Sequence, residues 1–112
     1  MIVDEYVRED GSCPFRGWFD DLDVQAAAKV AIAIVRMELG NLSNVKWIGS
    51  GLGECRIDWG PGYRLYVTQD GDELIILFVG GTKKRQQPDI RQASALLDEY
   101  KGRKAKAKKA RS

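Results

Sequence analysis

The segment Leu52–Gln69 reads LGECRIDWGPGYRLYVTQ, and its period of two decides the fold. Successive side chains of a strand point to opposite faces of a sheet, so alternation on both sides of a turn predicts an antiparallel hairpin. Gly60-Pro61-Gly62 supplies the turn. One face then carries Glu54, Arg56, Asp58, Arg64, Tyr66 and Thr68, and the other carries Cys55, Ile57, Trp59, Tyr63, Leu65 and Val67. We therefore expect one polar and one apolar face.

The flanking segments predict a sheet packed against helices. Asp70-Gly71-Asp72 is a favoured hairpin turn, and the unbroken apolar run after it is typical of a strand buried on both faces. The expected strands are Ile2–Arg8, Leu52–Trp59, Tyr63–Gln69 and Leu74–Val79; the expected helices are Pro14–Leu22, Val24–Leu39 and Pro88–Tyr100. Asp23 is the expected N-cap of the second helix, and Gly40 its stop. We expect Trp18, Phe19, Ile34 and Val35 in the core. The predicted fold class is α+β, in the order β-α-α-β-β-β-α, with an antiparallel sheet, an N-terminal helical hairpin and a C-terminal helix.

The formal net charge of +2 hides an asymmetry along the 112 residues. Seven of the 18 Lys and Arg residues lie in 101–112, which contains no acid and no apolar residue larger than alanine. The remaining 11 face 16 acidic residues, so residues 1–100 carry a net charge of −5. We predict one domain over residues 1–100 and a basic, disordered tail over residues 101–112.

Composition excludes several classes of function. The absence of histidine rules out His-based triads and His-ligated metal sites. The two cysteines, Cys13 and Cys55, form no CxxC pair and suggest neither a zinc site nor a secreted disulfide scaffold. We expect two reduced thiols, with one bridge left open, and predict no metal and no cofactor. Without an apolar run near 20 residues or a basic start, the sequence predicts a cytoplasmic protein with no membrane partner.

Basic side chains are expected to converge at the polar end of the sheet. Arg56 and Arg64 share the polar face, and Lys83-Lys84-Arg85 follows the buried strand directly. Guanidinium and ammonium groups beside a tyrosine suit a phosphodiester backbone with bases stacked nearby. A charged face is also typical of any half-exposed sheet, where Arg56 pairs with a neighbouring acid, and the basic turn is equally typical of a solvated loop. Asp89 is likewise typical of a helix N-terminal charge.

Three runs of sequence look like one known family. Gly53–Tyr66 resembles the E-x-R-I-D-x-G-P-G-Y-R-x-Y signature of HigB-like addiction-module killer proteins, in the RelE/ParE toxin superfamily. Gly80–Ile90 is similar to the family's G-G-x-K-x-x-Q-x-x-D-I stretch, and Gly11–Phe15 with Trp18 also looks like it. The match covers residues 6–100 in the right order.

The resemblance implies a RelE/ParE-like fold and the toxin of a type II toxin–antitoxin module. Many relatives in the superfamily are mRNA endonucleases that work on the ribosome without metal, using the substrate's 2′-hydroxyl as nucleophile, and the resemblance implies this activity here. Arg64 matches the arginine that holds the scissile phosphate, and Arg56 matches the basic position of the preceding strand. Lys83 or Lys84 matches a second phosphate contact or the acid. Relatives have a tyrosine or histidine near the start of the last helix that helps with proton transfer; residues 88–91 contain neither, which makes Asp89 the nearby substitute for a base, one that needs a raised pKa. The implied RNA-binding residues are Arg85, Tyr66 and Lys46, of which Tyr66 would stack on a base or orient the ribose.

The resemblance also implies partners and leaves alternatives open. The expected partners are mRNA on the ribosome and a cognate helix-turn-helix antitoxin of the HigA-like kind, in a hetero-oligomer. One alternative is a ParE-like toxin that inhibits DNA gyrase without cutting RNA, since one fold serves many functions. Another is a catalytically weak member that acts mainly in an antitoxin/repressor complex.

Overall fold

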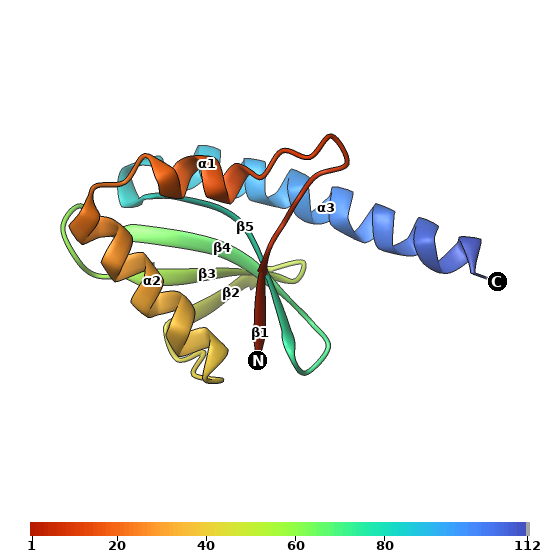
Figure 1. The fold of residues 1–112 in the computed structure, drawn as a ribbon, viewed down its shortest axis with the longest axis horizontal. Coiled ribbons are helices and arrows are strands. Elements are labelled where there is room, and N and C mark those ends of the chain that lie inside the picture. Colours follow the sequence, from red (N-terminus) through yellow and green to blue (C-terminus); the bar gives the residue numbers. More distant parts are fainter. Residues whose placement is uncertain (112) are drawn as a thin grey trace.

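The computed structural model describes Met1–Arg111 and has an α+β fold in which one sheet is covered by helices on both faces (Figure 1). The strands are β1 (Ile2–Glu5), β2 (Val45–Gly49), β3 (Leu52–Ile57), β4 (Tyr63–Asp70) and β5 (Leu74–Thr82). The helices are α1 (Pro14–Asp20), α2 (Val24–Glu38) and α3 (Gln86–Ala110), with a 3₁₀ turn, η1 (Lys83–Arg85), directly before α3. The structure thus confirms the α+β class with a C-terminal helix, whereas the predicted order β-α-α-β-β-β-α lacks β2.

The sheet is mixed, which corrects the prediction of a purely antiparallel one. Its strand order is β1-β5-β4-β3-β2, and β1 pairs with β5 in parallel while the other neighbours are antiparallel. The partner of β1 is chosen by tertiary packing, and nothing in the short pattern of its own residues indicates that choice. The edge strand β2 was missed because its five residues are mostly exposed and show no clear alternation.

The register of the β3–β4 hairpin confirms the predicted alternation. Cys55 pairs with Leu65, and Arg56 pairs with Arg64. The apolar side chains of both strands join the core beneath α1 and α2. The face predicted to be polar is largely covered, because α3 packs on it with Ala93, Leu96 and Leu97. Toward η1 and toward β2 this face stays partly exposed, as at Arg56 and Lys46.

The helix ends of α2 follow the predicted capping chemistry. The Asp23 carboxylate accepts a hydrogen bond from the Ala26 amide at 2.8 Å. At the other end Gly40 has a φ of 84°, and the amides of Gly40 and Asn41 bond back to the last turn in a Schellman motif. The prediction of Val35 as core was wrong: its side chain is 50% exposed, whereas Val30, Ala33 and Met37 are buried.

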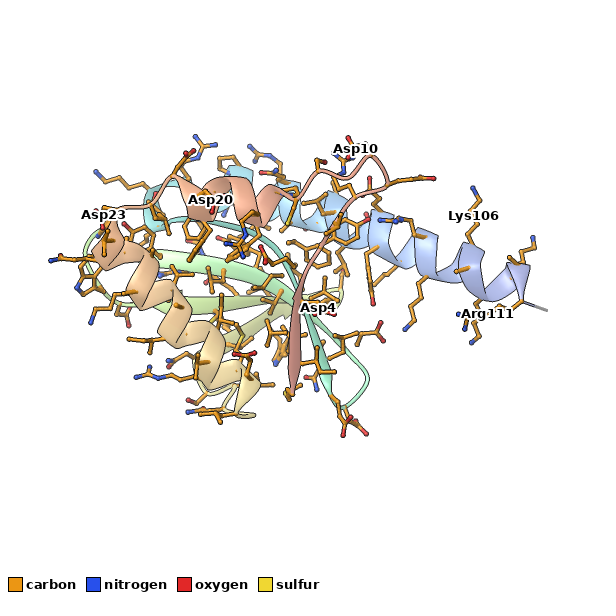
Figure 2. The ribbon with its side chains drawn as sticks, viewed as in Figure 1. Asp4, Asp10, Asp20, Asp23, Lys106 and Arg111 are labelled. Atoms are coloured by element: carbon orange, nitrogen blue, oxygen red, sulfur yellow. The ribbon has the colours of Figure 1, made fainter. Side chains whose placement is uncertain are left out.

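Helix α3 extends ten residues past its predicted end at Tyr100, in place of the disordered tail predicted from Lys101. Alanine and lysine are strong helix formers, and contacts to the domain hold the first turn beyond Tyr100. Lys101 donates to the Ser50 carbonyl at 2.9 Å, and Lys104 lies 2.5 Å from the Asp70 carboxylate. The distal part, with Lys106 and Arg111, projects beyond the sheet (Figure 2). The last residue of the predicted tail, 112, lies outside the described residues.

Both cysteines are free thiols, as predicted. Cys13 is half-buried, whereas Cys55 lies in the core, where burial raises the pKa of its thiol to about 11. Within residues 1–111, no helix has the length and apolar character that a membrane span requires.

Candidate functional site

The candidate site lies where a row of residues crosses β3, β4 and β5 on the face that α3 covers. Arg56 pairs with Arg64, and Arg64 pairs with Gly81 on β5. The Asp89 carboxylate, from the first turn of α3, packs directly on Gly81: a Cβ built there would lie 2.8 Å from Asp89 Cγ and still closer to Oδ2. The fold thus brings three of the predicted site residues, Arg56, Arg64 and Asp89, to one end of the sheet.

Glu54 holds this arrangement together, although its sequence position predicted only a place on the polar face, among the acids near Arg56. Its side chain is fully buried, and its Oε1 accepts a hydrogen bond from Arg56 Nε at 3.0 Å. Oε2 accepts from Gln86 Nε2, at the start of α3, at 2.7 Å. Arg64 Nε lies 3.5 Å from Oε1, which makes an ion pair without a hydrogen bond. The spacing of Glu54 and Arg56 on one strand was visible in the sequence, whereas the hydrogen bond from Gln86 that covers Glu54 was not.

Among residues 1–111, three buried side-chain atoms have no hydrogen-bond partner: Arg64 Nε, Tyr66 Oη and Asp89 Oδ2. Arg64 and Tyr66 share a face of β4, and Asp89 packs on Gly81, the strand partner of Arg64. Buried polar atoms in native proteins are almost always paired. Three unpaired atoms gathered at one place are therefore more typical of a functional site than of a structural core.

Burial sets the protonation behaviour of this cluster. It raises the pKa of Asp89, against the opposing effect of the Arg85 guanidinium 3.8 Å away. Burial also raises the pKa of Tyr66, and the negative charges of Glu54 and Asp89 act in the same direction. Tyr66 is therefore a neutral hydrogen-bonding group. It is 0% exposed, so the base-stacking role predicted for it is not available in this structure.

The basic turn η1 lies beside Arg64, as the sequence analysis predicted. The Lys83 amide donates to the Gly62 carbonyl at 2.8 Å, which ties η1 to the loop between β3 and β4. A Cβ on Gly62 would lie 3.4 Å from Lys83 Cβ and 3.8 Å from Arg64 Nη1. Lys83, Lys84 and Arg85 are all exposed. The nearly buried Arg64 therefore lies next to the exposed cations of η1.

Lys46 also lies on this face. It pairs with Glu54 across β2 and β3, and its side chain is exposed. Arg56, Arg64, Asp89 and η1 thus lie together at one end of the sheet, and Lys46 and Tyr66 lie beside Glu54 as its strand partners. Of the predicted residues, Arg64, Tyr66 and Asp89 are buried. The arrangement can bind an anion, stabilise negative charge and accept a proton on a carboxylate. Within residues 1–111 no group of three cysteine or acidic side chains is placed to hold a metal ion.

These features define an α+β protein with a cationic site between a mixed sheet and its C-terminal helix. No family model matches the chain. A protein of Haemophilus influenzae described as uncharacterized is 40% identical over 86 residues, which cover 76% of this chain and 87% of that protein. The chain belongs to the same family as that protein.

Proposed function

We propose that this protein is the toxin of a type II toxin–antitoxin module, with a RelE/ParE-like fold. Its activity would be that of an mRNA endonuclease that cuts at the ribosome, blocks translation and is neutralised by a cognate antitoxin. The observation that carries the proposal is the cluster of unpaired atoms at Arg64, Tyr66 and Asp89, beneath the exposed cations of η1. The sequence resemblance supplies the reaction, and the cluster supplies groups suited to it.

The reaction needs no nucleophile from the protein. The 2′-oxygen of the substrate attacks the adjacent phosphorus, and the bond from phosphorus to the 5′-oxygen breaks. The products are a 2′,3′-cyclic phosphate and a 5′-hydroxyl. The protein has to accept the 2′-hydroxyl proton, stabilise the charge that develops on the phosphate oxygens, and deliver a proton to the departing 5′-oxygen.

Arg64 is suited to stabilise the charge on phosphorus. Within residues 1–111 its guanidinium makes one side-chain hydrogen bond, from Nη1 to the Tyr63 carbonyl at 3.1 Å, so most of its donors are unused. Glu54 is a positioning residue, because both of its oxygens are already engaged in holding Arg56 and Gln86. Lys83 or Lys84 would provide a second phosphate contact or the proton for the 5′-oxygen.

Asp89 is a better candidate than Glu54 for the proton acceptor. Its Oδ2 has no hydrogen bond, and burial raises its pKa, which makes the ionised carboxylate more basic than an exposed one. The side chains of Arg64 and Asp89 are only 7% and 8% exposed. We therefore expect RNA binding to shift η1 and expose the two side chains, since η1 borders both: the Lys83 amide donates a hydrogen bond to the Gly62 carbonyl beside Arg64, and Arg85 is ion-paired with Asp89.

The burial of Arg64 and Asp89 is also compatible with the two alternative functions, gyrase inhibition and a role in a repressor complex. A toxin that inhibits gyrase by binding, or a weak member that acts in a repressor complex with its antitoxin, needs no accessible catalytic group. In both cases the cluster would only stabilise the start of α3. The proposed partners remain mRNA on the ribosome and a HigA-like antitoxin with a helix-turn-helix.

Mapping of mRNA ends after expression without antitoxin tests the proposal. We expect growth arrest with new, codon-phased 5′ ends, and a loss of cutting of about 10²–10³ in Arg64→Ala. Arg64→Lys keeps the charge and serves as the folding control, since it loses only the planar fork. Growth arrest without new ends would overturn the proposal, and gyrase-linked DNA breaks would favour the ParE-like alternative.

A further inference from the structure

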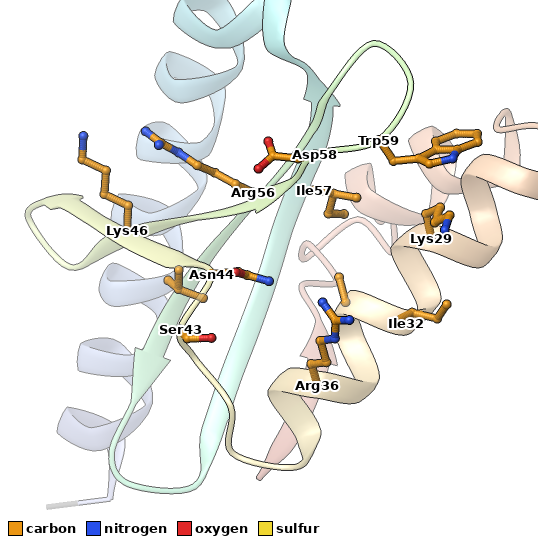
Figure 3. A pocket seen from close by; sticks show the side chains of 12 residues that line it. Lys29, Ile32, Arg36, Ser43, Asn44, Lys46, Arg56, Ile57, Asp58 and Trp59 are labelled. Carbon is orange, nitrogen blue, oxygen red and sulfur yellow. The ribbon is translucent and has the colours of Figure 1, made fainter.

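A groove of about 500 Å³ lies between α2 and the edge of the sheet, outside the cluster described above (Figure 3). It forms where β2 begins, because the Arg56 amide bonds to the Asn44 carbonyl and β3 then continues without a strand neighbour on that side. Its apolar floor includes Ala33 and Ile57. The groove therefore has one helical wall and one wall made by a strand edge.

The groove is strongly cationic in an otherwise acidic domain. Four basic residues line it, Lys29, Arg36, Lys46 and Arg56, against one acid, Asp58. In Figure 3 Lys29 and Arg36 extend from α2, whereas Arg56 and Lys46 leave the strands on the other side of the sheet edge. Within residues 1–111 no ion pair neutralises Lys29, Arg36 or Lys46. The cations thus surround the edge of β3 and remain available to an anion.

An aromatic side chain stands at one end of the groove. Trp59 is half-buried and stacks on Tyr63, with ring centroids 6.3 Å apart and an angle of 21° between the rings. Lys29 Nζ lies 5.9 Å from the centre of the indole. Cations along a groove combined with a fixed aromatic ring are typical of surfaces that bind single-stranded nucleic acid, where bases stack and phosphates pair.

The groove is continuous with the candidate site through Arg56. This residue lines the groove and is the direct strand partner of Arg64. A strand of RNA with one phosphate at Arg64 therefore has a cationic path past Arg56 and around the sheet edge. An acidic polypeptide would match the charge but would make no use of this continuity.

We infer that the groove binds the single-stranded RNA next to the reacting phosphate. Lys29 and Arg36 contact its phosphates, and Trp59 stacks against a base. The choice of RNA as the ligand rests on the proposed function, whereas the groove itself is a separate binding surface.

Binding of a fully 2′-O-methylated 10-nucleotide RNA, measured by fluorescence anisotropy at several salt concentrations, tests the inference. This probe has no 2′-hydroxyl and is not cut by the proposed reaction. We expect the double variant Lys29→Gln/Arg36→Gln to bind about tenfold more weakly at low salt, with a salt slope reduced by roughly 1.4, which is about 0.7 for each lost cation. Trp59→Leu is expected to lose about tenfold through stacking.

The matched control is Lys108→Gln/Arg111→Gln, which removes the same charge from the projecting end of α3. We expect a loss of less than about twofold there, because those residues are remote from the groove. Lys29 and Arg36 are exposed, so the melting temperature of their variant should match that of the wild type. Equal losses in both double variants would overturn the inference in favour of diffuse attraction. Unchanged RNA affinity with lost binding of a poly-glutamate peptide would overturn it in favour of an acidic polypeptide.

Failure of this inference is distinguishable from failure of the proposed function. A protein that cuts unmodified RNA while its groove variants bind the methylated probe normally would refute the groove alone. A protein that cuts no RNA while its groove variants selectively lose the probe would refute the proposed function and leave the groove as an RNA-binding surface.

Discussion

Gly81 is the position at which the packing of α3 on the sheet is most sharply testable. Its φ is not left-handed, so alanine fits the backbone there. A Gly→Ala change at such a site raises the free energy of unfolding by about 0.4–1 kcal/mol, because it lowers the conformational entropy of the unfolded chain. In the folded protein, however, the new Cβ would lie 2.8 Å from Asp89 Cγ and would overlap Oδ2. Overpacking of this kind costs about 1–3 kcal/mol. We predict that Gly81→Ala is destabilising by about 1–2 kcal/mol.

The same reasoning predicts that Asp89→Ala rescues Gly81→Ala. Asp89 Oδ2 has no hydrogen bond to lose, and the ion pair with Arg85 at 3.8 Å involves a largely exposed guanidinium. Asp89→Ala alone should therefore change stability by no more than about 1 kcal/mol, mostly through the helix N-terminus. The double variant should be about 1–2 kcal/mol more stable than the sum of the single effects.

Urea unfolding of the four proteins measures this coupling directly. Gly102→Ala is the control, because a Cβ there meets open space within α3 and should stabilise the protein by about 0.5–1 kcal/mol. Additive effects of Gly81→Ala and Asp89→Ala, within about 0.5 kcal/mol, would refute the packing of Asp89 on Gly81.

Three further predictions concern other parts of the molecule. Hydrogen bonds from Arg8 and Tyr6 lower the pKa of Glu99 to about 2 from its ordinary 4.5. The stability that this carboxylate contributes is full above pH 4.5 and falls as the pH drops toward 2, so Glu99→Gln should flatten that part of an acid-unfolding curve. An unchanged curve would contradict the contact. A thiol reagent at pH 8 should label Cys13 much faster than Cys55, whose pKa of about 11 and burial leave little thiolate; equal rates by mass spectrometry would contradict the buried position. Truncation after Lys104 keeps the contact with Asp70, so the melting temperature should stay unchanged. Ribosome binding should weaken because basic residues of the end of α3 are lost, and it should weaken more at low salt than at high salt. A loss of binding independent of salt would argue against a charge effect.

Local patterns predicted the parts of the fold that depend on neighbouring residues. The alternation from Glu54 to Tyr66 predicted the faces of the hairpin correctly, and Asp23 and Gly40 marked the ends of α2. Parallel pairing of β1 and the position of β2 depend on distant partners, and the sequence pattern carries no signal for either.

The sequence placed Arg56 and Arg64 side by side, but it predicted neither the roles of Glu54 and Gln86 nor the burial of the site. Charge and strand register placed Arg56 and Arg64 together, because side-chain alternation is a local property. The burial of Tyr66 and Glu54 follows from the way α3 and Gln86 lie over the sheet, which is a tertiary choice. The prediction of Val35 as core failed because an apolar residue on a helix does not itself indicate whether a neighbouring element covers it.

The chemistry of the cut ends tests the central claim most directly. Wild-type protein would be added to ribosomes that carry a defined mRNA, and the fragments would be analysed by mass spectrometry. We predict a 2′,3′-cyclic phosphate on the upstream fragment, a 5′-hydroxyl on the downstream one, and no cut when the nucleotide at the site carries a 2′-deoxyribose. An intact mRNA, or cutting that survives the 2′-deoxy substitution, would contradict the account.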